Sequence, residues 1–363
     1  MRMQQPISFA RGAPSLDIID VEGLKAAAVR ALEADPAGVT GYGTGYGYEP
    51  LREWIADRHG VGADRVLLTN GSLQADAFLF QHLVRAGGDV VVEKPTYDRT
   101  LLSLRALGAA VHQVSLQPDG LDVDELRKLL ESGVRPQLAH LIPNYQNPAG
   151  VTLSLAKRHQ LIELAREFDL TLFEDDPYAE IRFRGDALPS LLSLDASVLH
   201  ASSFTKTVCP GVRVGYLIGP AGLIAELARQ ATNTYISPGM LSEATVYQFC
   251  VLGHLERSIA TVRAALAERA RLLGEALREH IAGVRFTDPD GGYFLWVELP
   301  EDIDVAALAP AAQARGVAVV KGTDFLLEGG HHALRLAYSA VGPDQIVEGV
   351  RRLAAAVGAV RGH

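Results

Sequence analysis

The segment from Ala201 to Gly219 carries side chains that could bind and react with a phosphorylated aldehyde. Lys206 follows an apolar run, Val198–Leu199, and a turn rich in serine and threonine, and Arg213 comes soon after it. A lysine amine in this setting can form a Schiff base with an aldehyde. Neighbouring hydroxyl groups and a guanidinium can bind a phosphate by charge-assisted hydrogen bonds. A solvated surface lysine is the alternative interpretation of Lys206 alone.

This segment resembles the cofactor-lysine signature of the class I/II pyridoxal-phosphate (PLP) aminotransferases of fold type I. The branch most similar to it includes 2-aminoadipate and kynurenine aminotransferases and the regulators of the MocR type. The resemblance extends over essentially the whole chain. It implies that PLP is the cofactor, that Lys206 forms the Schiff base and shuttles the proton, and that Ser203 and Arg213 bind the phosphate.

Composition limits the class of protein. The chain has 363 residues, of which 48% are hydrophobic and 21% charged, and its net charge is −9, which argues against a broad nucleic-acid-binding surface. Two cysteines far apart, Cys209 and Cys250, fit a reducing cytoplasm rather than a disulfide framework. No apolar signal core and no run of about 18 apolar residues occurs. We therefore expect a cytoplasmic protein that binds neither nucleic acid nor membrane.

Alternating patterns predict an α/β fold. Amphipathic stretches such as Ser154–Phe168 separate apolar runs that read as buried strands, and this order favours a mostly parallel sheet with helices on both faces. The expected strands are Val66–Thr69, Asp89–Glu93, Leu138–Ile142, Leu170–Glu174, Val198–Ser202 and Val214–Ile218.

The rest of the chain predicts a second, smaller lobe. A helix-rich stretch, Ser242–Ile281, precedes strands within Gly292–Leu299, Val317–Val320 and Ala333–Ala337 and a last helix from Pro343, which together read as α+β. The resemblance implies the PLP-transferase fold type I, with residues 1–45 joining the small domain, 46–265 forming the large PLP-binding domain and 266–363 the small C-terminal domain.

Two further motifs carry polar groups that suit the cofactor ring. In Pro143–Thr152 the family has Asn-Pro-x-Gly, which implies that Asn147 donates to the phenolic oxygen of the ring; a turn that caps the next helix is the alternative. In Leu172–Ile181 an apolar strand ends in acids. The resemblance selects Asp175 as the carboxylate on the ring nitrogen, three residues before Tyr178, which contacts the ring oxygen.

The acids next to Asp175, Glu174 and Asp176, are its competitors for that role, and an acidic strand end facing solvent is the alternative for all three. Further upstream, Ser72 and Leu73 open a helix whose free backbone N–H groups suit a phosphate, although such a start is usually only a cap. Relatives often have glutamine where this chain has Leu73. Tyr97 is expected to stack on the ring; a core or rim tyrosine is the alternative.

A loop of alternating glycine and tyrosine, Gly41–Arg52, bears on the assembly. In relatives this loop crosses a dimer interface, which implies that Tyr42 reaches the partner's phosphate and that the protein is a homodimer with shared active sites. A flexible loop of low complexity is the alternative interpretation. Tyr46 and Tyr48 line the substrate pocket or pack in the core.

Arg335 lies in an apolar strand, where a buried guanidinium needs an anionic partner. The resemblance implies that it binds the substrate α-carboxylate, together with Asn147 and with Gly12, whose segment folds over the site in relatives. Arg11 and Lys321 either bind a distal carboxylate or are exposed and inert. His331 and His332 are adjacent, so they point apart on a strand and predict no metal site.

The sequence therefore predicts a PLP-dependent aminotransferase that moves an amino group between an α-amino acid and a 2-oxo acid in a ping-pong cycle. The same residues would serve β-elimination, cyclisation or oxidation of an amino acid. A PLP-binding regulatory domain is the alternative from another class. A nicotinamide dehydrogenase is disfavoured because no Gly-x-Gly-x-x-Gly follows an early strand. The sequence does not identify the donor, the acceptor or the pathway.

Overall fold

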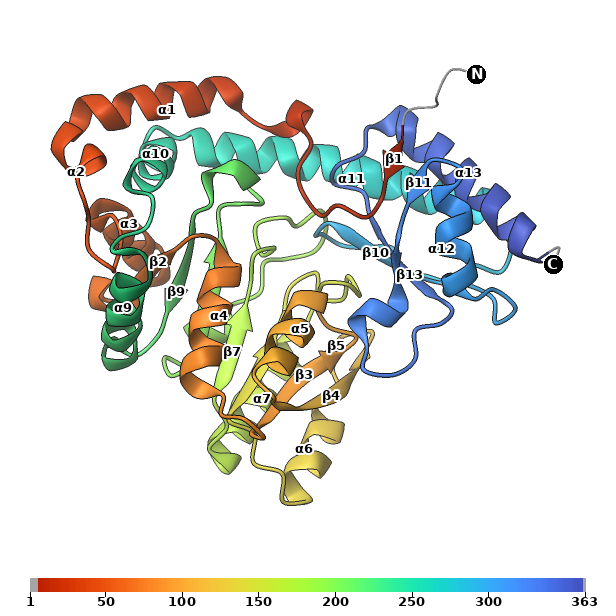
Figure 1. Cartoon of the computed structure of the whole chain (residues 1–363), viewed down its shortest axis with the longest axis horizontal. Helices are drawn as coiled ribbons and strands as arrows, with labels where there is room; N and C mark the ends of the chain where they lie inside the picture. Colours follow the sequence, from red (N-terminus) through yellow and green to blue (C-terminus); the bar gives the residue numbers. More distant parts are fainter. Residues whose placement is uncertain (1–5, 362–363) are drawn as a thin grey trace.

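The computed structural model describes residues 6–361, and its centre is an eight-stranded sheet (Figure 1). In spatial order the strands are β2 (Val66–Thr69), β9 (Gly215–Ile218), β8 (Leu199–Ser203), β7 (Leu172–Asp175), β6 (Leu138–Leu141), β3 (Asp89–Lys94), β4 (Ala110–Gln117) and β5 (Gly120–Leu121). The five strands from β8 to β4 run parallel. Strand β9 is antiparallel to both of its neighbours, and β5 is antiparallel to β4. The predicted α/β fold with a mostly parallel sheet is confirmed.

Both faces of this sheet are covered because successive side chains of a strand point to opposite sides. In β3, Val90 and Val92 pack in one hydrophobic cluster while Val91 packs in another. The helices of the first face are α4 (Ser72–Leu83), α5 (Asp98–Ala106) and α9 (Ala221–Tyr235). Those of the second face are α3 (Glu49–His59), α6 (Val123–Glu131), α7 (Leu155–Phe168), α8 (Leu191–Leu194) and α10 (Met240–Val251).

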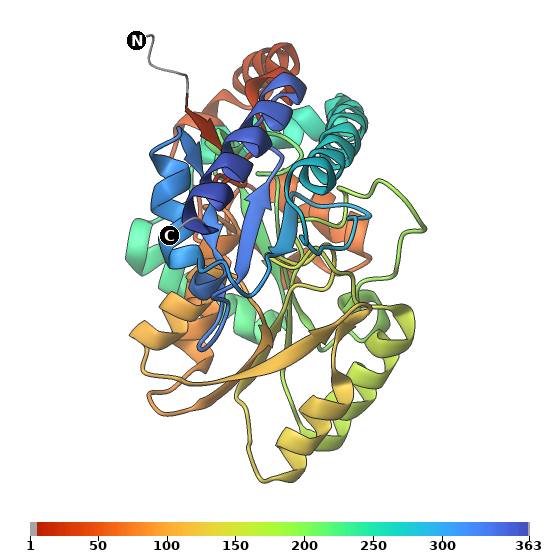
Figure 2. The same cartoon turned by 90° about the vertical axis from the view of Figure 1, so that its right-hand side faces the viewer.

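A smaller α+β lobe packs at one end of the large one. Its sheets are β10 (Phe294–Glu298), β13 (Ala333–Ala337) and β12 (Val320–Lys321), which run antiparallel, and the parallel pair β1 (Ile7–Ser8) and β11 (Val317–Ala318). Its helices are α11 (His254–His280), α12 (Val305–Gln313) and α13 (Pro343–Arg361). Figure 2 shows α13 and α11 side by side.

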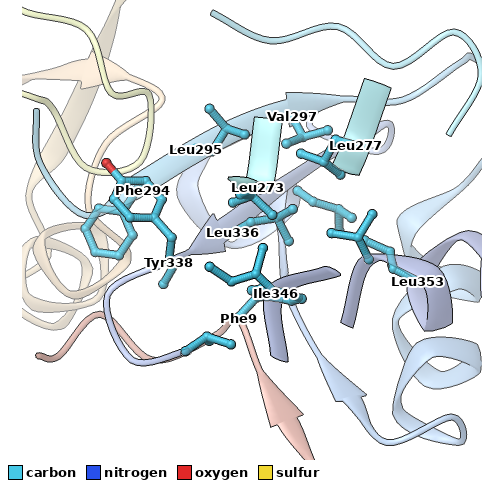
Figure 3. Packing of buried hydrophobic residues seen from close by; sticks show 14 of the residues in the cluster. Phe9, Leu273, Leu277, Phe294, Leu295, Val297, Leu336, Tyr338, Ile346 and Leu353 are labelled. Atoms are coloured by element: carbon cyan, nitrogen blue, oxygen red, sulfur yellow. The ribbon is translucent and has the colours of Figure 1, made fainter. Parts of the chain in front are cut away.

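One hydrophobic cluster unites the elements of this lobe. Figure 3 shows Leu295 and Leu336 of the sheet facing Leu273 of α11 and Ile346 of α13, with Phe9 of the N-terminal segment against them. Phe9, Leu273, Leu336 and Ile346 are each 0% exposed, so the N-terminal segment is an integral part of the lobe's core.

The N-terminal segment divides between the two lobes. Strand β1 pairs with β11, but α1 (Val21–Ala34) and α2 (Pro36–Thr40) pack on α10 and belong to a hydrophobic cluster of the large lobe. Residues up to 45 therefore do not join the small lobe as one piece. In addition, α11 runs unbroken through residue 265 and contributes to the clusters of both lobes. The domain limits at 45 and 265 stay a prediction.

Each predicted strand of the large sheet is present within two residues of its expected ends. The sequence did not predict β4 and β5 at the edge of the sheet. The expected strand Val317–Val320 is in fact two short strands, β11 and β12, which pair with different partners. Within residues 6–361, no helix combines the length and the apolar character needed to cross a bilayer.

Candidate active site

The predicted site residues meet at the carboxyl ends of the parallel strands, where ligands bind in sheets of this kind. Lys206 follows β8, Asp175 ends β7, and Asn147 follows β6. They border a cavity of about 190 Å³. The predicted residues that line it are Ser72, Leu73, Tyr97, Asn147, Asp175, Tyr178, Ser203, Lys206 and Arg213.

The amine of Lys206 is buried between the two lobes. Its Nζ donates a hydrogen bond to the carbonyl oxygen of Gly12 at 2.8 Å and lies 5.0 Å from the centre of the Tyr293 ring. Burial lowers the pKa of Lys206 to about 8, and the positive charge of Arg335 adds to this lowering, while Asp175 opposes it. A neutral amine, which can act as nucleophile and base, is therefore available near neutral pH.

Strand alternation separates the three acids of the Glu174-Asp175-Asp176 run. Glu174 accepts hydrogen bonds from the backbone N–H groups of Leu191 and Leu192 and pairs with His200 at 2.8 Å. Although burial opposes the change, the hydrogen bond from His200 lowers the pKa of Glu174.

Asp176 is equally engaged, because Asn144 Nδ2 donates to it at 2.7 Å and the backbone N–H of Ala179 donates to its other oxygen. Burial raises the pKa of Asp176 to about 6, and the charge of Glu174 adds to the rise. Only Asp175 of the three faces the cavity with Lys206, and its Oδ1 has no hydrogen-bond partner among the described residues. The geometry therefore favours Asp175 over its two competitors.

A phosphate-sized cradle lies at the start of α4. The first N–H groups of a helix have no partner in the helix itself and favour an anion. Gly71 has φ 82°, and a Cβ at this position would lie 2.4 Å from Arg213 Nη2; a Cβ on Gly215 would lie 2.5 Å from the nitrogen of Ser72. These two glycines let the helix start, β9 and the Arg213 guanidinium approach one another.

Two hydroxyl groups complete this cradle. Ser203 Oγ donates to Thr205 Oγ1 at 2.7 Å, and both residues line the cavity. Arg213 Nη2 donates to the carbonyl oxygen of Asn70 at 2.9 Å, which fixes the guanidinium beside the helix start.

Arg335 is held on β13 without a carboxylate. Its Nη1 donates to Asn147 Oδ1 at 3.0 Å and its Nη2 donates to the carbonyl oxygen of Ala10 at 2.9 Å, while its Nε has no partner among the described residues. The guanidinium lies 4.4 Å from the Phe294 ring centre and 4.8 Å from that of Phe325. Burial lowers its pKa. Within the described chain it forms no ion pair, so it is poised for an external anion.

The aromatic residues form the walls. Tyr178 is 4% exposed, and burial raises the pKa of its hydroxyl. Burial also raises the pKa of Tyr97, to about 12, so that both phenols stay protonated at neutral pH. Tyr293 donates from its hydroxyl to the carbonyl oxygen of Lys206 at 2.8 Å.

Five residues considered from the sequence are not part of the cavity lining, and two of them, Arg335 and Gly12, are hydrogen-bonded to lining residues. Tyr42 is 86% exposed. Arg11 is exposed, and the side chain of Lys321 is 42% exposed with its Nζ 3.7 Å from Asp324. Gly12 is next to the cavity through its hydrogen bond with Lys206.

Sequence reasoning missed two ionisable residues of the site. Asp76 lines the cavity, and His140 lies on β6 with its Nε2 3.7 Å from Asp175 Oδ2. Asp76 follows Ser72 by four residues in the same helix, and this spacing on one helix face was the signal that could have found it. No comparable signal marks His140, whose position depends on the pairing of β6 with β7.

The residues present fit PLP. A phosphate suits the start of α4 with Arg213, a protonated pyridine nitrogen suits the unpartnered Asp175 Oδ1, and an aldehyde suits the Lys206 amine. The three requirements lie around one cavity, which a single aromatic ring can bridge.

The comparisons with known proteins agree with this geometry. Residues 5–353 match the family described as aminotransferase class I and II. The chain is 33% identical over 358 residues to a 2-aminoadipate transaminase of Thermus thermophilus, covering 97% of this chain and 90% of that protein. The chain therefore belongs to the class I and II aminotransferase family, and it is a PLP-dependent aminotransferase.

Its fold superposes with a TM-score of 0.94 on the crystal structure of the α-aminoadipate aminotransferase of Thermus thermophilus in complex with N-(5'-phosphopyridoxyl)-L-leucine, at 31% identity and with 98% of this chain and 93% of that one covered. The predicted fold type I and its cofactor are confirmed. The chain is also 32% identical over 316 residues to the transcriptional regulator TauR of Rhodobacter capsulatus, covering 85% of this chain and 64% of that protein.

The lowered pKa of Lys206 gives the first prediction. Below pH 8 the amine gains a proton and loses its nucleophilic lone pair, so the rate at which the cofactor-free chain takes up PLP should rise with pH and level off above about 8. Since the charge of Asp175 raises this pKa, Asp175→Asn should move the inflection to lower pH. Stopped-flow absorbance at several pH values measures the rate.

The matched control is Lys321→Gln, which removes an exposed amine and should leave the profile unchanged. An inflection near the ordinary lysine value of 10.5 would contradict the assignment.

Proposed function

We propose that this aminotransferase acts in the cytoplasm on an α-amino acid and a 2-oxo acid, with glutamate and 2-oxoglutarate as one of its substrate pairs. The observation that carries the proposal is the shared cavity of Lys206 and Asp175, closed on the small-lobe side by Arg335 through Asn147. When bound, PLP supplies an aldehyde for the amine and a ring that withdraws electrons from the substrate Cα.

Lys206 is the proton carrier. In its neutral form, Nζ would remove the proton from the substrate Cα and, once protonated, return it on the cofactor side, so that one group would serve as both general base and general acid. The burial that lowers its pKa to about 8 keeps a usable fraction of the amine neutral at physiological pH.

Asp175 is the partner of the ring nitrogen. A carboxylate there holds a proton on the nitrogen and so maintains the electron-withdrawing form of the ring. Asn147 and Tyr178 lie on the same cavity and offer an amide and a phenol as donors to the ring oxygen. Tyr97, at the start of α5, supplies an aromatic face for stacking.

The phosphate is held by the start of α4, with the N–H groups of Ser72 and Leu73, and by Ser203 and Arg213. These groups would hold the phosphate and so keep the cofactor in place while Lys206 acts. The fork of N–H donors of the guanidinium and the free N–H groups at the helix start both favour a doubly negative phosphate.

Arg335 receives the substrate α-carboxylate. Its partly free guanidinium and the neighbouring Asn147 match the fork of a carboxylate, and the Gly12 carbonyl accepts a hydrogen bond from Lys206. Because any α-amino acid and any 2-oxo acid carry this carboxylate, one arginine can serve both halves of the cycle.

Two rival functions use the same residues. Other PLP reactions, such as β-elimination or oxidation, need the same lysine, acid and arginine. The likeness to TauR supports a second candidate, a regulatory domain that binds PLP without turnover. Product analysis separates all three.

The decisive experiment is a half-reaction with glutamate. Glutamate alone should convert the bound PLP to the pyridoxamine form with release of one equivalent of 2-oxoglutarate, and a second 2-oxo acid should restore the starting absorbance spectrum. Borohydride reduction followed by peptide mapping should find the pyridoxyl group on Lys206. Ammonia or peroxide in step with turnover would instead identify a lyase or an oxidase, and spectral binding without any product would favour a regulator.

The second experiment concerns Arg335→Ala. Loss of one member of a buried charge pair costs about 2–5 kcal/mol, so kcat/KM should fall roughly 30-fold or more with every donor. PLP should stay bound, because Arg335 is not one of the cavity-lining residues that form the phosphate cradle. Steady-state kinetics with alanine and with glutamate measure the effect.

One variant is the control for this experiment, and a second variant probes the distal carboxylate. Arg285→Ala removes an exposed arginine that pairs with Glu298 and should leave kcat/KM unchanged. Lys321→Ala should affect glutamate more than alanine if Lys321 binds the distal carboxylate. Near-normal kinetics of Arg335→Ala with any α-amino acid would refute its role.

We further propose a homodimer in which Tyr42 completes the partner's phosphate site. Tyr42 is 86% exposed, and the exposed apolar residues Ile236 and Leu241 flank the segment that its neighbour Gly43 contacts. Exposed apolar side chains that gather in this way are typical of an interface. The backbone N–H of Tyr48 donates to Glu243 at 2.7 Å, which holds the loop against α10.

Hybrid dimers test this sharing. In a mixture of Tyr42→Phe and Lys206→Ala chains, each hybrid has one site with both changes and one site with neither. Activity above the sum of the two parents would support shared sites, measured after denaturation and joint refolding. A monomer in analytical ultracentrifugation at assay concentration would contradict the proposal.

A further inference from the structure

Asp76 is a buried acid for which the roles above provide no function. It lies on α4 one turn after Ser72, is 2% exposed, and lines the same cavity as Lys206 and Asp175. Residues four apart on a helix share one face, so Asp76 lies deeper along the face that begins at the phosphate cradle.

Asp76 meets two other polar side chains at the floor of the cavity. A carboxylate oxygen of Asp76, a carboxylate oxygen of Asp175 and a ring nitrogen of His140 lie within 4.8 Å of one another. Four buried atoms of these side chains have no hydrogen-bond partner among the described residues: Asp76 Oδ1, Asp175 Oδ1 and both ring nitrogens of His140. Buried polar atoms are rarely left without a partner, so these side chains are expected to form a hydrogen bond with one another or to bind a ligand.

The two oxygens of Asp175 face different neighbours. His140 Nε2 is 3.7 Å from Oδ2, whereas Oδ1 has no hydrogen-bond partner within residues 6–361. A carboxylate oxygen of Asp76 lies within 4.8 Å of one of Asp175, and a hydrogen bond between them requires an approach to about 2.5–3.0 Å. Two buried carboxylates so close would repel one another, and a proton on Asp76 relieves this repulsion.

Among the described residues, no positively charged group around α4 neutralises Asp76 in place of a proton. Lys206 and Arg213 line the cavity from the segments that join β8 to β9, and neither forms an ion pair with Asp76 among the described residues. On α9, Glu226 pairs with His82 at the far end of α4, and on α5 Asp98 pairs with Arg99. Asp175 and His140 are thus the ionisable groups that face Asp76 from β7 and β6.

We propose that Asp76 is a positioning residue for Asp175: it keeps a proton and donates it in a hydrogen bond to the second carboxylate, so that one negative charge faces the ring nitrogen. This rests on the proposed role of Asp175 at the nitrogen of PLP. Asp76 fixes the direction of the Asp175 carboxylate and limits the negative charge of the cavity floor.

A purely structural role predicts different behaviour. If Asp76 only filled space, leucine would replace it better than asparagine, because an apolar side chain of similar size costs nothing to bury. If Asp76 is a donor, asparagine replaces it, because its amide donates a hydrogen bond and cannot ionise. A divalent cation held by the three side chains is the other rival explanation.

The first arm of the test measures PLP affinity of the full-length protein by absorbance titration at neutral pH. Asp76→Asn should bind PLP within about threefold of the natural chain, whereas Asp76→Leu should bind roughly tenfold more weakly or worse, because a hydrogen bond to a charged group is lost. Asp186→Asn, at an exposed loop aspartate, is the matched control. Equal affinity of the leucine variant would overturn the proposal.

The second arm measures the melting temperature of the full-length protein without cofactor between pH 5 and pH 9. Burial raises the pKa of Asp76 well above its ordinary value of 3.8, and the charge of Asp175 adds to this. The folded chain therefore holds a proton that the unfolded chain releases, so stability falls as pH rises above 3.8 through the folded pKa. Asp76→Asn lacks this loss, and its melting temperature should exceed that of the natural chain by roughly 2 °C or more at pH 9 but not at pH 5.

Parallel melting profiles of the natural chain and Asp76→Asn would overturn the proposal. A melting temperature of the natural chain that rises with Zn²⁺ and falls with a chelator, with no such response in Asp76→Asn, would show a bound cation instead. The melting arm needs no PLP. Failure of the natural chain to bind PLP would therefore reject the proposed function, while the melting profiles would still test whether Asp76 holds a proton.

Discussion

The desolvation of one amine is the constraint on which the rest of the structure depends. Lys206 is useful only as a neutral amine, and burial lowers its pKa to about 8. Burial requires a cover, and neither lobe provides it alone. The large lobe positions Lys206 at the end of β8, while the small lobe contributes Tyr293, and the N-terminal segment contributes the Gly12 carbonyl that accepts from Nζ. Phe9 in the small-lobe core and the Ala10 carbonyl on Arg335 anchor this segment.

The exclusion of water from the interior also determines how one strand end can carry three acids. Side chains alternate across β7, so Glu174 points to the face where backbone N–H groups and His200 stabilise its charge, and Asp175 points to the cavity. Asp176 follows the strand and is satisfied by Asn144 and a backbone N–H. Buried carboxylates without such partners would be costly. The acid left without a partner for one oxygen is the one that a cationic ring nitrogen can satisfy.

Much of this site could be predicted from the sequence because its parts are local. A lysine, an arginine and two hydroxyls within the segment from Ala201 to Gly219 specify their own neighbourhood, and six strands of the sheet are contiguous apolar runs. Asp76 was not predicted, because its approach to Asp175 depends on how α4 packs over β8 and β9. Strand β4 was missed because its residues are only half-buried at a sheet edge and lack the apolar signal. The packing of α1 on α10 could not be predicted either. The buried face of α1 consists of the small residues Gly23, Ala27 and Ala31, which do not specify one packing partner.

The charges of the site also depend on the state of Asp76. Lys206, Arg213 and Arg335 are the basic groups around the cavity, and the ligands of an aminotransferase bring a phosphate and a carboxylate, both anionic. Two ionised aspartates on the floor would repel those ligands in a medium of low dielectric constant, where charge interactions are strong. A proton on Asp76 leaves one negative charge on the floor, carried by Asp175 and placed to hold the ring nitrogen protonated. The arginines then remain available to the phosphate and the substrate carboxylate, so the same floor that activates the ring does not weaken the binding of either anion.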